Sequence, residues 1–274
     1  MMTARTLLPM AVVSILTLPA AHAQSPQTLV QQAVDTELAA SRNDHSLWHY
    51  RMKETQENNS IYDVVDTPHG EVKQKIEQQG RPLTPEEQQA ETARVHSFVN
   101  DKRAQAKQKR DGEHDDQSAE KMLNLLPRAF TWTLTSTSGN DITLHFVPDP
   151  DFRAPDIESR VLAAMEGDLV IDRQQHRVRI IRGKLSHDVQ IGFGFLGKLH
   201  QGGTFNVERS QLAPGLWQIT ETHVHIEGRA LLFKNIGQQT DEIKYRFEPV
   251  APSITLNEAA SMVASRQKES PSNP

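Results

Sequence analysis

Cysteine is absent from this chain of 274 residues. Its absence excludes disulfide bonds, thiolate metal sites and a cysteine nucleophile. It also excludes a lipid attached to a cysteine behind a signal peptide. Any binding or chemistry must therefore use other side chains.

An excess of positive charge is absent as well, because 35 acidic residues against 30 Lys and Arg give a formal net charge of −5. A chain without an overall basic field is not drawn to nucleic acid. Its 36% hydrophobic and 24% charged residues are typical of a globular protein. We expect one or two domains and no nucleic-acid partner.

Long apolar runs are missing after the first 20 residues. Before that point, Arg5 precedes an apolar run over residues 7–18, and the segment closes with Ala21-His22-Ala23. The run is too short to span a bilayer, and the small residues at its end favour cleavage by signal peptidase. We therefore expect residues 1–23 to be a signal peptide, cleaved before Gln24, and the mature protein to be soluble and periplasmic or secreted.

Two helix starts are well specified. Ser25-Pro26 opens an apolar pattern with helical spacing, and Thr84-Pro85-Glu86-Glu87 forms a capping box. The second start opens a charged helical insertion over about residues 84–126, and the basic run at 102–110 carries no apolar residue larger than alanine. We interpret that run as a solvated helix face, with contact to an acidic partner or a membrane surface as the alternative.

Alternating apolar patterns, bounded by turn residues, predict a series of strands. The clearest hairpin turns at Ser138-Gly139-Asn140. The strands follow one another without long helices between them, which favours an antiparallel sheet. Strands are expected at residues 47–55, 61–66, 71–78, 130–134, 142–146, 167–172, 177–185, 203–209, 217–226, 230–235 and 242–248.

Gly192, Gly194 and Gly197 spell the letters of a dinucleotide-binding fingerprint. That fingerprint needs a helix directly after the glycines, but only four residues separate Gly197 from Gly202. We therefore expect no cofactor. The glycines are interpreted as a bend or bulge in a strand, which lets the sheet curve.

The order of these elements resembles the half-barrel carriers of the lipoprotein-localisation type. The stretches FVPDPDFRAPDIESRVLAAMEGDLVID, GKLSHDVQIGFGFLGKLHQGGTF and GRALLFKNI are similar to a group of uncharacterised exported bacterial proteins near that fold. The resemblance implies an α+β protein whose strongly curved antiparallel sheet is partly covered by helices. It also implies a single domain over residues 24–265. The polar composition of residues 266–274 predicts a disordered tail. In such carriers the concave face holds acyl chains, so a hydrophobic or lipid-like ligand is implied.

Six aromatic residues are candidates for the wall of a ligand site, with the apolar core as the alternative. They are Trp132, Phe146, Phe193, Phe195, Trp217 and Phe233.

His223 and His225 are the best candidates for chemistry, because alternate residues share one face of a strand. His187 and Asp188 would join them if their strands are neighbours. A catalytic zinc site uses three protein ligands, so two histidines favour a solvent-facing pair over a metal site. Motifs of serine hydrolases and zincins are absent from the sequence.

The sequence thus favours a non-enzymatic carrier of a hydrophobic ligand in the cell envelope. One alternative is a metal-dependent enzyme that uses His223 and His225. Another is a scaffold protein that meets a protein partner through the charged segment 86–110.

Overall fold

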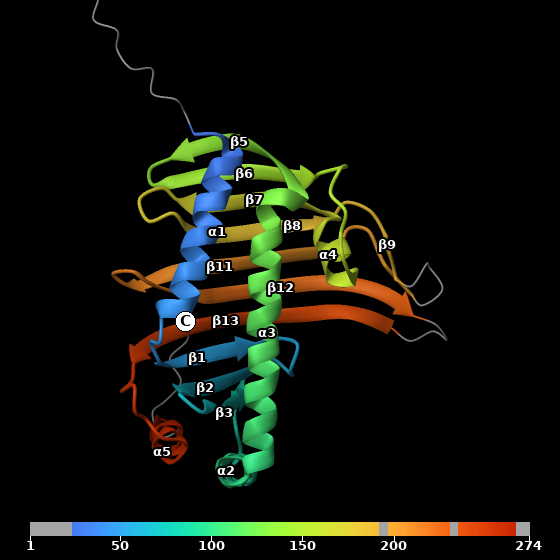
Figure 1. Ribbon diagram of the computed structural model, residues 1–274. Coiled ribbons are helices and arrows are strands. Elements are labelled where there is room, and N and C mark those ends of the chain that lie inside the picture. The colour runs from blue at the N-terminus through green and yellow to red at the C-terminus, as the bar shows by residue number, and fades with distance from the viewer. Residues whose placement is uncertain (1–23, 192–196, 231–234, 267–274) are drawn as a thin grey trace, which may run out of the picture.

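A computed structural model of the chain describes residues 24–191, 197–230 and 235–266. Within these ranges the protein is an α+β structure with five helices and one large antiparallel sheet, which is not closed (Figure 1). The expectation of an antiparallel α+β fold is confirmed. No helix in the described ranges is long and apolar enough to cross a bilayer.

The five helices in the described ranges are α1 (Pro26–Asn43), α2 (Pro85–Asn100), α3 (Lys102–Ala129), α4 (Ile157–Leu162) and α5 (Leu256–Arg266). Two of them, α1 and α2, begin at the starts that the sequence predicts.

Thirteen strands form the sheet in the described part of the chain. They are β1 (Trp48–Glu54), β2 (Ser60–Thr67), β3 (Gly70–Gln78), β4 (Arg81–Pro82), β5 (Phe130–Ser138), β6 (Asp141–Pro148), β7 (Met165–Asp172), β8 (Arg177–Leu185), β9 (Val189–Ile191), β10 (Gly197–Leu199), β11 (Thr204–Ala213), β12 (Leu216–Ala230) and β13 (Asn235–Pro249). Most of the separate strand expected at 230–235 lies outside the described residues; its two end residues belong to β12, which runs to Ala230, and to β13, which begins at Asn235. The residues between these strands lie outside the described ranges.

The strand order is β4-β3-β2-β1-β13-β12-β11-β8-β7-β6-β5. The first strand of the chain therefore pairs with the last, with Arg51 opposite Tyr245. Two short strands leave this path, because β10 pairs with β12 and β9 pairs with β10. The sheet is assembled from an N-terminal meander and a longer C-terminal one, which meet at β1 and β13.

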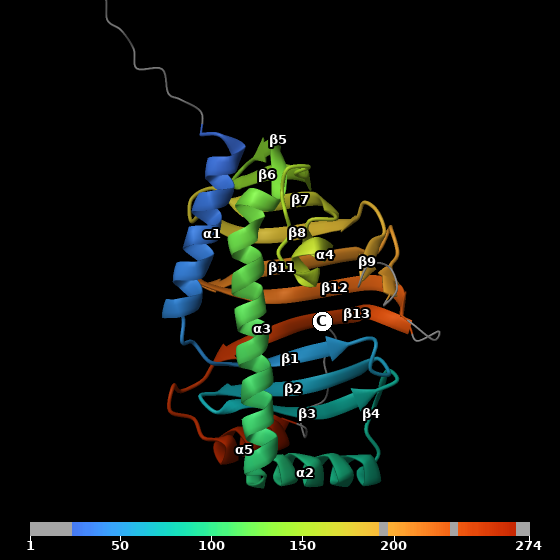
Figure 2. The same cartoon turned by 45° about the vertical axis from the view of Figure 1, so that its right-hand side comes forward.

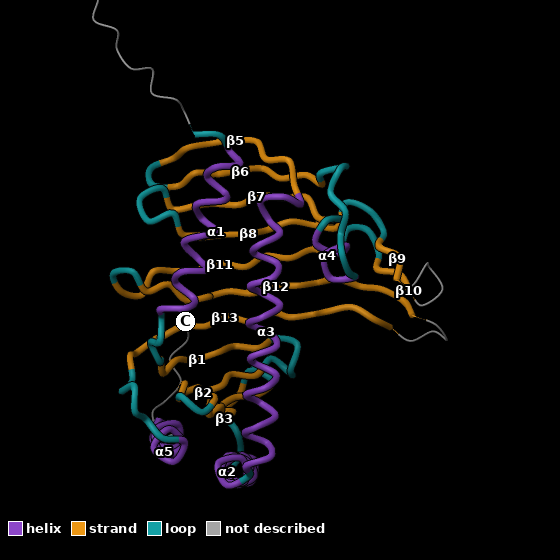
Figure 3. The backbone as a smooth tube through the Cα atoms, in the orientation of Figure 1, coloured by secondary structure: helices purple, strands orange, loops and turns teal. Residues whose placement is uncertain are grey.

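Helices cover the sheet unevenly. Figures 1 and 2 show α1 and α3 on the same side of the sheet, with α3 running across the strands; the backbone trace in Figure 3 shows the same crossing. We call this side the inner face; it carries Phe146, Phe205 and Val224, while the alternate residues, such as His145 and His223, lie on the outer face. The second apolar cluster joins α5 and α2 to outer-face residues of β2 and β3.

A break at Asp101 divides the expected charged helix into α2 and α3, which run in different directions (Figure 2). Asp101 has extended backbone angles, and its carboxylate accepts hydrogen bonds from the N–H groups of Arg103 at 2.8 Å and Ala104 at 3.1 Å. It is therefore the N-cap of a new helix. That helix continues through Asp115, Asp116 and Pro127 to Ala129.

Two glycines on adjacent strands allow a close backbone approach. Gly167 of β7 pairs with Gly183 of β8. A Cβ atom on Gly167 would overlap the carbonyl oxygen of Arg182, and one on Gly183 would overlap the carbonyl of Glu166. Only glycine fits at these positions, as is typical where a sheet bends sharply. The expected glycine bend at residues 192–194 lies outside the described residues.

Helical side chains occupy the free edge of β3. Lys75 N–H donates to the carboxylate of Glu91 at 2.7 Å, and Arg94 donates to the carbonyl of Lys73. Gln108 of α3 donates to the carbonyl of Glu71 at 3.2 Å. These contacts satisfy backbone groups that would otherwise offer a template for another strand.

Candidate functional site

The inner face is divided along its length, and one end is a packed core beneath α1. Leu29, Val30, Ala33 and Val34 of α1 pack in one apolar cluster with residues of β5 to β8, including Leu144 and Leu169. The spacing of the α1 residues places them on one side of the helix. This end of the inner face is filled by the protein's own side chains.

α3 packs mainly at the two ends of its path. It packs against β3 and α2 near its start, and against α1, α4 and β5 toward its end. Between these ends, every residue from 109 to 117 is exposed. That segment covers about two and a half helical turns, so no side of it is buried against the sheet that it crosses.

A half-buried apolar strip lies on the inner face between the core and the charged end. Phe205 of β11 is opposite Val224 of β12, and Ile181 of β8 is opposite Val207 of β11. Ile181, Phe205 and Val224 touch the main core but are not enclosed by it. The strip thus presents apolar surface on the face that α3 crosses.

The inner face becomes charged toward β13 and β3. Lys244 lies 3.1 Å from Glu242 and 5.4 Å from the centre of the Tyr50 ring, which stacks on Phe247 at 5.2 Å. Nearby, burial raises the pKa of Asp66 to about 6. Apolar and charged surface therefore follow each other along one face.

A buried ion pair fixes α1 over this face. Glu37 is 5% exposed and receives hydrogen bonds from Arg177, Arg209 and the N–H of Val178. Burial acts to raise the pKa of Glu37, but the hydrogen bond from Arg177 and the charge of Arg209 outweigh it and hold that pKa below its usual value. Glu37 is therefore charged and fully engaged, and is a positioning group.

The predicted aromatic residues occupy different places. Trp132 and Phe146 are buried in the main core, with ring centres 5.4 Å apart. Trp217 is also buried, its ring N–H donates to Gln175 at 3.0 Å, and Arg177 lies 5.9 Å from its ring. The predictions for Phe193, Phe195 and Phe233 fall outside the described residues.

His223 and His225 lie on the outer face, away from α1 and α3. Each ring is 2.8 Å from a different oxygen of Asp241, and the two side chains are 32% and 49% exposed. The hydrogen bond to Asp241 raises the pKa of His223. Within the described part of the chain, no cluster of His, Asp or Glu has the arrangement of a metal site.

His187 and Asp188 do not join this pair, because His187 bonds to Ser186 and Asp188 pairs with Lys198 at 2.6 Å. Another histidine, His49, is 3% exposed and bonds to Asp63 at 2.9 Å. No local sequence pattern indicates this pair, because its members are 14 positions apart on separate strands.

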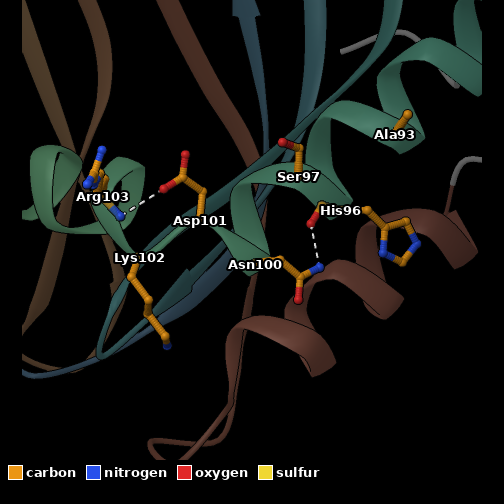
Figure 4. Close-up of a pocket in the computed structure, with 7 residues that line it drawn as sticks. All are labelled: Ala93, His96, Ser97, Asn100, Asp101, Lys102 and Arg103. Atoms are coloured by element: carbon orange, nitrogen blue, oxygen red, sulfur yellow. Dashed lines mark hydrogen bonds between the residues drawn. The ribbon is translucent and has the colours of Figure 1, made fainter.

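Four hollows in the described ranges have polar rims, and Trp132, Phe146 and Trp217 line none of these four. The largest of them, with a volume of about 640 Å³, lies at the corner between α2 and α3 (Figure 4). Another, of about 380 Å³, lies beside α4 and β9 and includes Phe152 and Val189, which belong to or touch the main core.

Comparisons with models of known protein families, with curated proteins and with solved structures found no match.

Proposed function

We propose that the protein is an exported binding or carrier protein for a hydrophobic or lipid-like ligand in the cell envelope. In this proposal the open sheet acts as a half-barrel, its inner face receives the ligand, and α3 crosses over the ligand. The signal-peptide pattern at residues 1–23 and the resemblance to half-barrel carriers favour this role.

One observation carries the proposal: half-buried Ile181, Phe205 and Val224 lie on a face crossed by a helix whose middle residues, 109–117, are all exposed. Exposed apolar surface costs free energy in water, and covering it with a ligand recovers that cost. A helix that is polar all round would give such a ligand a hydrated outer boundary. The charged surface near Lys244 and Glu242 would meet the polar end of an amphipathic ligand.

The test begins with native mass spectrometry of the purified protein, followed by extraction of bound lipids. We expect a co-purifying acyl-chain compound that is lost on denaturation. Val224→Glu, on the inner face, should abolish its retention, while Val224→Thr should weaken it. The matched control is Val147→Glu, because Val147 is 38% exposed and lies on the outer face.

Circular dichroism must show that each variant keeps its fold. The proposal fails if the protein emerges without any lipid and does not bind added fatty acid. It also fails if Val147→Glu and Val224→Thr lower retention equally. One equivalent of zinc in place of lipid would favour the enzyme hypothesis based on His223 and His225.

A further inference from the structure

The first turns of α3 carry a dense group of positive charges, the basic segment, defined as residues 102–110. It contains five cations and no carboxylate, and each of the cations is exposed: Lys102, Arg103, Lys107, Lys109 and Arg110. The inward side of the helix is taken by Gln105, which bonds to the carbonyl of Val99, and Gln108, which bonds to that of Glu71. The five cations therefore lie on the sides of the helix that remain exposed.

Most of this charge is not neutralised by the protein itself. Lys107 pairs with Asp111 at 2.5 Å and Lys109 approaches Glu113 at 3.8 Å. For the other three cations, no carboxylate in the described ranges lies within 4.0 Å. Asp101, the nearest acid in the chain, uses its carboxylate to cap the helix. A local positive surface thus persists on a chain of net charge −5.

The first turn of α3 carries charges of the sign that the helix dipole disfavours there. Lys102 and Arg103 occupy the first turn, where the helix dipole favours acids. The acidic residues follow in the middle, at 111–116. Helix stability therefore does not explain this arrangement.

The basic segment begins beside the hollow at the α2–α3 corner. Figure 4 shows Lys102 and Arg103 leaving the first turn of α3 in different directions, with His96, Ser97 and Asn100 on the neighbouring turns of α2. All of these side chains can donate hydrogen bonds to phosphate oxygens. The corner offers many donors, while its single carboxylate is already engaged.

We propose that the basic segment docks the protein on the surface of a bilayer containing anionic phospholipids. The five cations extend over eight residue steps, about 12 Å of helix, on the exposed side of one corner. Mobile lipid headgroups can meet such flexible side chains without a fixed register, and each Lys or Arg near an anionic surface adds roughly fivefold to binding. This docking goes beyond ligand binding and does not depend on it.

The experiment measures co-sedimentation of the purified protein with vesicles of phosphatidylglycerol and phosphatidylcholine, against phosphatidylcholine alone. The test variant replaces the three cations without carboxylate partners: Lys102→Gln, Arg103→Gln and Arg110→Gln. The matched control is Arg153→Gln, Arg160→Gln and Arg173→Gln, which removes three exposed cations that also lack a carboxylate partner in the described part of the chain. Both variants carry the same N-terminal segment and the same net charge.

We expect binding to the mixed vesicles only, and a loss of about a hundredfold in affinity for the test variant but little change for the control. Raising the salt from about 0.1 M to about 1 M should release the wild type, because the Debye length falls from about 10 Å to 3 Å. The proposal is overturned if the wild type ignores anionic vesicles or if both triple variants lose binding equally. Displacement by inorganic phosphate far beyond that by chloride of equal ionic strength would also overturn it, and would indicate a discrete phosphate pocket at the α2–α3 corner.

Discussion

Glu37 of α1 and Arg177 of β8, 140 positions apart in the chain, form a two-point ion pair, with Nε to Oε1 at 3.0 Å and Nη2 to Oε2 at 3.1 Å. Both side chains are buried, and the pair joins α1, which packs on the main core, to strand β8 of the sheet. The Glu37 carboxylate has no free acceptor position, because Val178 N–H and Arg209 donate to it in addition to Arg177.

Replacing Glu37 with Gln should destabilise the protein by about 3–5 kcal/mol, because two arginines would be left without their counter-charge in a buried place. Thermal and urea unfolding measure the change. Asp35→Asn is the control, since Asp35 is exposed on the same helix and bonds only to Gln31. Equal effects of the two substitutions would show that the ion pair does not hold α1 in place.

The carboxyl group of Asp66 should make the stability of the protein depend on pH. Burial raises its pKa from 3.8 to about 6, against the hydrogen bond from Trp48 N–H and with the help of the charge on Glu71. A raised pKa means that the folded protein binds this proton more tightly than the unfolded chain. The stability due to this group is therefore greatest below pH 3.8 and is lost as the pH rises through about 6.

Asp66→Asn should consequently stabilise the protein by roughly 1–2 kcal/mol at about pH 7 and make little difference at about pH 4. Urea unfolding across this range measures the difference. Asp151→Asn, at an exposed position in a turn, serves as the control. A constant difference between wild type and Asp66→Asn at every pH would contradict the assignment.

Two substitutions of glycine by alanine should change the stability of the protein in opposite directions. Gly167→Ala should cost about 1–3 kcal/mol, because its methyl group meets the backbone of β8. Gly112→Ala should instead stabilise by about 0.5–1 kcal/mol, because Gly112 lies within α3 with no atom near its added Cβ. Melting temperatures of the two variants check both predictions. If Gly167→Ala is neutral, the two strands can separate at this point.

Loss of the helical side chains that bond to the free edge of β3 should promote association between copies of the protein. Glu91→Ala removes the acceptor for Lys75 N–H and the partner of Arg94, which leaves two backbone groups of an edge strand without their contacts. We expect concentration-dependent oligomers in sedimentation velocity, together with a loss of about 1–2 kcal/mol. Glu86→Ala, at an exposed position of the same helix, should sediment in the same way as the wild type.

Much of the fold could be predicted from the sequence because its strands have clear alternation and its helices have capping signals. The hairpin at Ser138-Gly139-Asn140 and the capping box at Thr84 are both present. The break at Asp101 could not be predicted because the charged run after it has no apolar pattern that would reveal the start of a new helix. Pro127 lies in the last turn of α3, which ends two residues later at Ala129.

The candidate site was harder to predict, because it depends on which face of the sheet a helix covers. Alternation places Trp132 and Phe146 on one face, but cannot distinguish a core from a ligand wall. The same pattern places His223 and His225 together without showing Asp241 between them. The strip of Ile181, Phe205 and Val224 joins three strands, so no local stretch of sequence contains it.

The pairing of β1 with β13 also sets the order in which this chain can fold. A nascent chain that ended before residue 235 would hold β1–β3 and β5–β12 as two unconnected sheets, each with an unpaired edge. The contacts that join them close almost the longest loop the chain can make, which is slow. During synthesis, those two edges therefore stay unpaired until the last strand is made, and in that interval they are open to pairing with other chains.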